Sequence, residues 1–205
     1  MDNRRELAAA ILAGGRARRM DGVNKGTLVI GRTAIIDRQL QTLGEVAHDI
    51  FVVGRSDIAW TSRGLRVISD EIPDAGPLGG IYTAIVRSPC ERTLVVACDM
   101  PFLSSAFLRE LAAVKDADLV IPRHARGHEP LCAIYSRACA EDIRERLARG
   151  VNEASRLPVG MRVTEVDVDN ETFFVNVNTP HDYERARRLG LVESKSMRDR
   201  IMDVS

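Results

Sequence analysis

A glycine- and arginine-rich segment near the start of the chain contains residue types that bind phosphate. It reads LAGGRARRMDGVNK from Leu12 to Lys25 and directly follows an apolar run. The paired glycines Gly14 and Gly15 let a backbone approach a ligand closely and point N–H groups at it. Basic side chains outnumber the one acidic side chain, Asp21; they are Arg16, Arg18, Arg19 and Lys25. The segment predicts a polyphosphate-binding loop, although an isolated Gly-Gly turn is more often a surface loop with solvated arginines.

Two standard phosphate-binding motifs do not occur in this sequence. A P-loop requires Gly-Lys-Ser or Gly-Lys-Thr, whereas this chain has Asn24-Lys25-Gly26. No G-x-G-x-x-G pattern occurs either, so the chain is not an obvious dinucleotide-binding dehydrogenase.

An aspartate stands at the end of a second strongly apolar segment. TLVVAC, from Thr93 to Cys98, runs directly into Asp99, and Pro101 follows. A carboxylate at the carboxyl end of a parallel strand faces the ligand crevice, and a hard oxygen ligand there suits Mg²⁺ with its phosphates. The alternative is that Asp99 only caps the turn before the next helix.

The segment GPLGG, which begins at Gly76, has three glycines at a predicted helix start, with Asp70 upstream. Glycines at such a place allow a base or ribose to pack against backbone, so Gly76 and Asp70 are candidate nucleotide contacts. An ordinary entry into a helix accounts for the proline and one glycine, but not for all three glycines.

Two asparagines, Asn176 and Asn178, precede Thr179-Pro180. We expect a strand over 173–177, and residues i and i+2 of a strand share a face, so both amides could line one side of a pocket. It is about as plausible that one of them only caps the helix that Thr179-Pro180 opens.

A basic segment, RHARGHE, spans Arg123 to Glu129 and could bind a second anionic ligand. His124 and His128 have the i, i+4 spacing of metal ligands on a helix. Gly127 and Pro130 argue against a helix there, so a metal is not favoured.

The elements that would position these residues alternate between strands and helices. This order predicts a three-layer, Rossmann-like α/β fold with a mostly parallel sheet, in a single domain over 1–190 with a tail at 191–205. The strand expected over 131–135 breaks the alternation and would add an antiparallel edge. Expected strands are 7–13, 50–53, 65–68, 93–98, 118–121, 131–135, 162–166 and 173–177; expected helices are 33–43, 77–86, 104–115, 137–149 and 179–189.

Length, charge and composition exclude several classes of protein. The longest apolar run has seven residues, Leu7 to Ala13, whereas a membrane helix needs about 20. Twenty-nine basic residues balance 29 acidic ones, so the chain has no net positive charge that would attract nucleic acid or an anionic membrane. The four cysteines have neither C-x-x-C nor zinc-ligand spacing, and no export signal is evident. We therefore expect reduced thiols and a cytoplasmic location.

Five motifs together resemble the molybdenum cofactor guanylyltransferases, the MobA family. They are, in order, LAGGRARRMDGVNK, GPLGG, CDMPFL, HEPLCAIY and FFVNVNTP, and the resemblance covers about residues 7 to 190. It implies a nucleotide-diphospho-sugar-transferase-like fold that couples GTP to molybdopterin and releases pyrophosphate.

The resemblance also implies roles for individual residues. Leu12, Ala13, Gly14, Lys25 and Asp70 match the family's GTP contacts, and Asp99 matches its nucleotide and magnesium aspartate. Asn176 and Asn178 match an N-x-N segment near the second substrate. We expect Mg²⁺ on Asp99, with Lys25 and Arg19, to offset the charge of the two polyanionic substrates. Transient contacts with other cofactor-biosynthesis proteins are also expected.

The chain departs from the family pattern at two positions. Asp21 stands where the family usually has glycine, and Asn24 replaces the usual aspartate before the lysine. The LAGG sequence favours guanine, since the related cytidylyltransferases typically have LAAG. Alternatives are a cytidylyl or sugar-1-phosphate nucleotidyltransferase on the same fold and a non-catalytic GTP-binding module.

Overall fold

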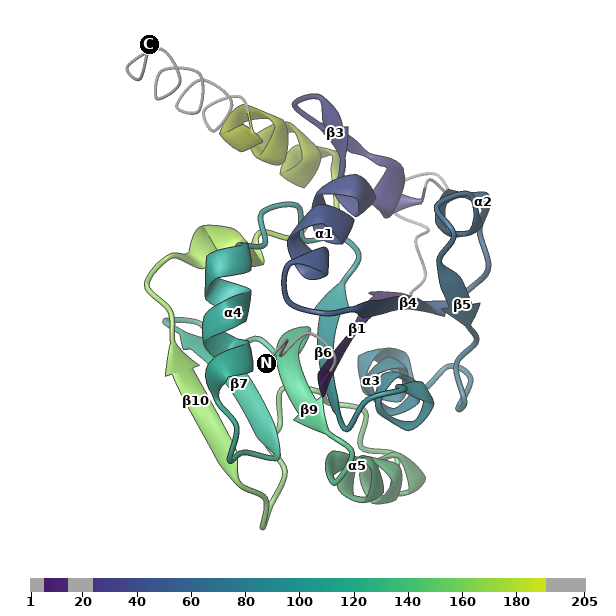
Figure 1. The fold of residues 1–205 in the computed structure, drawn as a ribbon, viewed down its shortest axis with the longest axis vertical. Coiled ribbons are helices and arrows are strands. Elements are labelled where there is room, and N and C mark those ends of the chain that lie inside the picture. Colours follow the sequence, from purple (N-terminus) through teal and green to yellow (C-terminus); the bar gives the residue numbers. More distant parts are fainter. Residues whose placement is uncertain (1–5, 15–23, 191–205) are drawn as a thin grey trace.

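The computed structural model describes residues 6–14 and 24–190, which are built around one eight-stranded sheet (Figure 1). The strand order is β10-β7-β9-β6-β1-β4-β5, and β8 pairs with β7. The strands are β1 (Leu7–Ala13), β4 (Asp49–Gly54), β5 (Arg66–Ile68), β6 (Arg92–Ala97), β7 (Leu119–His124), β8 (Gly127–His128), β9 (Cys132–Ser136) and β10 (Val163–Asp167). A separate two-stranded sheet pairs β2 (Val29–Ile30) with β3 (Thr33–Ala34).

Helices cover both faces of this sheet, so the molecule has three layers (Figure 1). They are α1 (Ile35–Gly44), α2 (Ile58–Thr61), α3 (Gly76–Arg87), α4 (Ser105–Ala113) and α5 (Cys139–Ala148), with the 3-10 helices η3 (Lys25–Thr27) and η4 (Glu171–Phe174). Residues 180–190 are also helical.

Strand β1 shows why an uninterrupted apolar run is needed at the centre of the sheet. Ala9 and Ile11 belong to the core that contains side chains of α1 and α4. Ala8, Ala10 and Leu12 belong to the opposite core, with side chains of α3 and α5. A strand that is buried on both faces cannot alternate apolar with polar residues.

The predicted mostly parallel sheet is confirmed. Strand β1 pairs in parallel with both β4 and β6, β4 with β5, and β7 with β10. Strand β9 is antiparallel, as expected, but its predicted place at an edge is wrong, because it lies between β6 and β7. All five of its residues are buried, as an interior strand requires.

Two local predictions are also wrong. The helix expected over 33–43 does not begin at Thr33: that residue lies in β3, and α1 begins after Ala34 without a side-chain cap. The strand expected over 173–177 is instead η4 followed by irregular backbone. Phe173 and Phe174 contact the ring of Phe107 from α4, so their apolar character serves helix packing rather than a strand ladder.

Within the described ranges, no helix is long and apolar enough to cross a membrane. The four cysteines are free thiols. The predicted tail at 191–205 lies outside the described residues.

Candidate nucleotide site

The carboxyl ends of the parallel strands bring the candidate residues to one edge of the sheet. Leu12 pairs with Ala97 of β6 and with Val53 of β4, so β1 ends beside both neighbours. The backbone N–H of Cys98 donates to the carbonyl of Leu12 at 3.1 Å. The glycine loop after β1 and the aspartate after β6 therefore start from adjacent points, as the parallel arrangement predicts.

Lys25 and Asp99, which are 74 positions apart in sequence, form an ion pair at this edge. Lys25 Nζ lies 3.1 Å from Asp99 Oδ2 and 2.5 Å from Asn178 Oδ1. Only 17% of the Lys25 side chain and 13% of the Asp99 side chain are exposed. The three residues thus form one polar cluster, with the ammonium between a carboxylate and an amide oxygen.

The backbone around Lys25 is fixed by local contacts. Asn24 Oδ1 accepts a hydrogen bond from the backbone N–H of Gly26 at 3.0 Å and caps η3. A Cβ on Gly26 would lie 2.5 Å from a ring carbon of Trp60, so only glycine fits beside that indole. Asn24, which replaces the usual family aspartate, is therefore a helix cap here.

The turn that carries Asp99 is held from a helix. Gln39 of α1 is buried, and its Nε2 donates to the carbonyl of Ala97 at 2.7 Å and of Met100 at 3.1 Å. Gln39 was not among the residues predicted from the sequence, although a polar residue on the otherwise apolar face of a helix is a signal of such a role. Burial raises the pKa of the adjacent Cys98 thiol to about 12, so this thiol is not a reactive thiolate near neutral pH.

Asn178 reaches the cluster without belonging to a strand. The N–H of Val177 donates to the Asp99 carbonyl at 3.0 Å. Asp182 then accepts hydrogen bonds from the N–H groups of Asn178 and Thr179, which fixes the start of the last helix. Asn176 is not hydrogen-bonded in this way: its Oδ1 is buried and has no partner among the described residues. The expectation that both asparagines share a strand face is wrong.

We call the ends of β1, β4 and β5 with the start of α3 the glycine side of the site. A Cβ on Gly14 would lie 3.6 Å from Asp70 Oδ2, and one on Gly80 would lie 3.1 Å from the Leu12 side chain. Gly76 has a φ of +66° and precedes Pro77 in the first turn of α3. Burial raises the pKa of Asp70. Backbone and small residues make this side, as the GPLGG pattern predicts.

We call the end of β6, residues 128–131 and residues 175–178 the polar side. It carries Asp99, Glu129, Asn176 and Asn178, with Lys25 between the two sides. Glu129 belongs to the HEPLCAIY motif, and the sequence predicts no particular role for it. Its carboxyl is mostly buried, and burial is the main reason that its pKa rises to about 7.

The structure does not leave the basic segment free to bind an anion. Arg123 pairs with Glu165 and Asp167, Arg126 pairs with Glu171, and His128 lies 2.9 Å from Glu165. Strand β7 extends through His124, and β8 folds back on it, so the segment is a hairpin. Neighbouring carboxylates balance its charge.

A divalent metal fits the polar cluster. No group of three or more histidine, cysteine or acidic side chains forms a metal site within 6–14 and 24–190. Magnesium bound through substrate phosphates requires only one or two carboxylates, and Asp99 with the Asn178 amide oxygen supplies hard oxygen donors. Gly15 and Arg19, also predicted to bind phosphate, lie outside the described residues.

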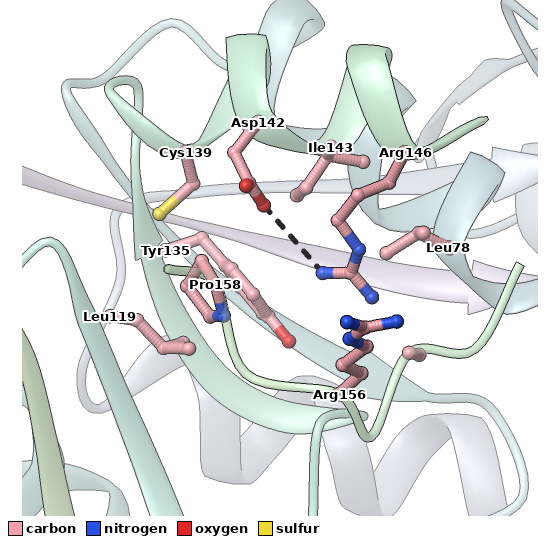
Figure 2. A pocket seen from close by; sticks show the side chains of 10 residues that line it. Leu78, Leu119, Tyr135, Cys139, Asp142, Ile143, Arg146, Arg156 and Pro158 are labelled. Atoms are coloured by element: carbon pink, nitrogen blue, oxygen red, sulfur yellow. Dashed lines mark ion pairs between the residues drawn. The ribbon is translucent and has the colours of Figure 1, made fainter. Parts of the chain in front are cut away.

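A separate cavity between α5, β9 and the start of α3 is too small to be the nucleotide site (Figure 2). Figure 2 shows Arg146 and Arg156 beside Tyr135, with Asp142 paired to Arg146 at 3.6 Å. Its volume is about 10 Å³, room for about one water molecule.

Comparison with known proteins gives consistent matches. A model of the MobA-like NTP transferase domain matches residues 9–159. A probable molybdenum cofactor guanylyltransferase from Pelotomaculum thermopropionicum is 37% identical over 89% of this chain and 92% of that protein. The molybdenum cofactor guanylyltransferase of Desulfosudis oleivorans is 33% identical over 88% and 94%. The structure of molybdopterin-guanine dinucleotide biosynthesis protein A from Archaeoglobus fulgidus superimposes with a TM-score of 0.72 at 25% identity, over 89% of this chain and 97% of that one.

The fold and the site define a nucleotidyltransferase with a nucleotide-diphospho-sugar-transferase-like architecture, which confirms the predicted fold class. Within this class, the chain belongs to the MobA-like NTP transferase family, and the resemblance seen in the sequence is confirmed.

Proposed function

We propose that this protein transfers GMP from GTP to molybdopterin and releases pyrophosphate. The relatives named as molybdenum cofactor guanylyltransferases align over most of the chain. The observation that carries the proposal is the cluster of Lys25, Asp99 and Asn178 at the carboxyl edge of the sheet. The cluster combines a cation with hard oxygen donors, and we propose that the phosphates of both substrates meet there.

The reaction is a substitution at the α-phosphorus of GTP. An oxygen of the molybdopterin phosphate forms a new bond to that phosphorus, and the bond from the phosphorus to the α,β-bridging oxygen breaks. The bridging oxygen keeps the electron pair and leaves with pyrophosphate. A phosphate monoester has its second pKa near 6, so the nucleophile is already anionic and no strong general base is needed.

Positioning and charge neutralisation are then the main tasks of the protein. Two unit charges 4 Å apart repel by about 4 kcal/mol at an effective dielectric of 20. Lys25 offsets this repulsion, and we assign the same role to Arg19. Asp99, assisted by Asn178, would hold Mg²⁺, which supplies charge stabilisation for the transferring phosphoryl group and the leaving pyrophosphate.

The glycine side would hold the nucleotide. We propose that Leu12, Ala13, Gly14 and Gly15 line its phosphates and sugar, and that Gly76 and Asp70 contact the base or ribose. The polar side, with Asn176 and Asn178, would hold molybdopterin. This division places the two substrates on opposite sides of the Lys25–Asp99 pair.

The test is a thermal melting series with Mg²⁺ complexes of GTP, CTP and UTP, repeated without magnesium. Because a ligand that binds only the folded state raises its stability, Mg-GTP should raise Tm more than Mg-CTP or Mg-UTP. Equal stabilisation by Mg-CTP would favour the cytidylyl alternative. Release of pyrophosphate when molybdopterin is added would exclude a non-catalytic GTP-binding module.

We further propose that the reaction takes place in the cytoplasm, with transient contacts to other cofactor-biosynthesis proteins. The free thiols of all four cysteines are consistent with a reducing compartment.

A further inference from the structure

Glu129 is held at the same sheet edge as Asp99 by its own neighbours. Its backbone N–H donates to the Pro122 carbonyl at 3.0 Å, and its carbonyl accepts from the N–H of Cys132 at 3.1 Å. The side-chain carboxylate accepts a hydrogen bond from the N–H of Leu131. The Leu131 carbonyl in turn accepts from Ala97 at 3.0 Å, which links this loop to the end of β6.

Among the residues that the structure describes, no lysine or arginine lies within hydrogen-bonding distance of the carboxylate. Its side chain is 17% exposed, and the nearest ring nitrogen, His124 Nε2, is 3.9 Å from Oε2. Arg126 attracts the carboxylate over a longer range, but its Nε is 3.1 Å from Glu171. A buried carboxyl that lacks a close cation lowers the stability of the fold, so the place of Glu129 at the same sheet edge as Asp99 points to a role in binding.

Two further buried polar atoms in this region have no hydrogen-bond partner among the described residues, His124 Nε2 and Asn176 Oδ1. The His124 side chain is 5% exposed, and its ring stacks on Phe174 at 5.3 Å between centroids. The N–H of Arg126 donates to its Nδ1, so in the neutral ring Nε2 carries the proton. An unmatched donor, His124 Nε2, thus lies 3.9 Å from a Glu129 carboxylate oxygen, and the polar side also holds an unmatched acceptor, Asn176 Oδ1.

We propose that Glu129 is a specificity-determining residue that accepts hydrogen bonds from the 2-amino group and the adjacent ring N–H of the pterin in the acceptor substrate. A carboxylate has two parallel acceptor oxygens, and this edge of a pterin presents two parallel donors. The inference rests on the proposed function, because it takes molybdopterin as the acceptor.

Guanine presents the same pair of donors, so the location of Glu129 in the fold is needed to assign it to the pterin or to the guanine of GTP. In the strand order, β9 and β7 lie beyond β6, on the opposite side from β1, β4 and β5. Asp70 and the glycines of α3 lie on the β1–β4–β5 side. Glu129 therefore faces the acceptor rather than the GTP base.

The test compares Glu129→Gln with the wild type and with Glu141→Gln, the same change at an exposed carboxylate on α5. In steady-state pyrophosphate release, Glu129→Gln should raise the KM for molybdopterin about 10- to 100-fold, the loss expected for hydrogen bonds to a charged group. The KM for GTP and the Tm shift with Mg-GTP should stay at wild-type values. Glu141→Gln should change none of these quantities.

A binding assay separates this role from catalysis. Fluorescence titration with 6-methylpterin and with 6-methyllumazine, which has an oxo group in place of the 2-amino group, should show that the wild type prefers the pterin. Glu129→Gln should lose the preference, and Glu129→Asp, which keeps the carboxylate, should retain part of it. An unchanged KM for molybdopterin, an unchanged preference, or a loss of Mg-GTP stabilisation would overturn the proposal. Absence of GMP transfer by the wild type would contradict the proposed function instead. The pterin titration would still test whether Glu129 binds the pterin, because it does not depend on GMP transfer.

Discussion

The glycine side and the polar side of the site are built from different kinds of residues. The glycine side relies on close approach: a Cβ on Gly54, whose φ is +144°, would lie 2.8 Å from the Ala13 carbonyl carbon. The polar side relies on side chains from segments far apart in sequence: Asn178 contacts Lys25 from 153 positions away. Substitutions on the glycine side should therefore act through packing and stability, and those on the polar side through charge and rate.

The largest effect is expected on the polar side. Asp99→Ala should lower kcat/KM for GMP transfer by about 1,000-fold, because it removes the carboxylate proposed to hold the metal. The variant should keep the far-UV circular dichroism spectrum of the wild type. Asp116→Ala, at an exposed position, is the control. Near-native turnover of Asp99→Ala in a steady-state assay would remove Asp99 from the mechanism.

On the glycine side we expect a loss of stability rather than a loss of catalytic rate. Gly54→Ala should lower the free energy of unfolding by about 3 kcal/mol and Tm by about 8 °C, because the new methyl group meets backbone that cannot move aside. Gly44→Ala is a matched control, since a Cβ there meets nothing within 4 Å. Denaturant and thermal unfolding measure both. Equal stability of the two variants would contradict tight packing of Gly54 against the Ala13 backbone.

Lys25 lies between the two sides and should affect both binding and rate. Lys25→Ala should reduce kcat/KM about 100-fold and diminish the Tm shift produced by Mg-GTP, because it removes a charge from the phosphate site. Lys115→Ala, which breaks an exposed pair with Glu6, should leave both unchanged. A variant that loses activity yet keeps the full Mg-GTP shift would restrict Lys25 to the acceptor side.

A pH-dependent change in stability is expected at Glu129. Its pKa rises from the usual 4.5 to about 7, mainly through burial and with a contribution from Asp99, while Arg126 opposes the rise. The folded state therefore binds more protons than the unfolded state between these values, and ionisation of Glu129 lowers the free energy of unfolding as pH rises through that window. Glu129→Gln should be more stable than the wild type by about 3 kcal/mol at pH 8 and equal to it near pH 4.

Urea unfolding at a series of pH values measures this difference. Glu141→Gln, at an exposed position, should show no such trend. If the difference in free energy of unfolding between Glu129→Gln and the wild type is the same at every pH, burial does not raise the pKa of Glu129.

The sequence was sufficient where the signal is local. The run from Leu7 to Ala13 predicted β1 residue for residue, because a strand covered on both faces needs continuous apolar side chains. The GPLGG pattern predicted the start of α3, and the structure shows why Gly80 is needed there, since a Cβ on it would lie 3.1 Å from the Leu12 side chain. The position of Asp99 after an apolar strand placed it at the correct edge of the sheet.

The sequence was insufficient where partners are distant. The apolar residues of β9 fit an edge as well as an interior strand, and only pairing with both β6 and β7 decides between them. Phe173 and Phe174 fit a strand by composition, yet α4 offers them a packing surface. The charges of Arg123 and Arg126 suggested an anion site until carboxylates from other segments were found beside them.

The α/β class, the parallel strands at the centre and the glycines at the start of α3 could be predicted from the sequence, since each follows from periodicity or backbone freedom within a few residues. Only the tertiary structure shows that Lys25 pairs with Asp99 and Asn178, that Gln39 holds the turn beneath them, and that Glu129 is buried with no lysine or arginine close to it among the described residues. Those features depend on which segments become neighbours, and that is set by packing of the whole chain rather than by local pattern.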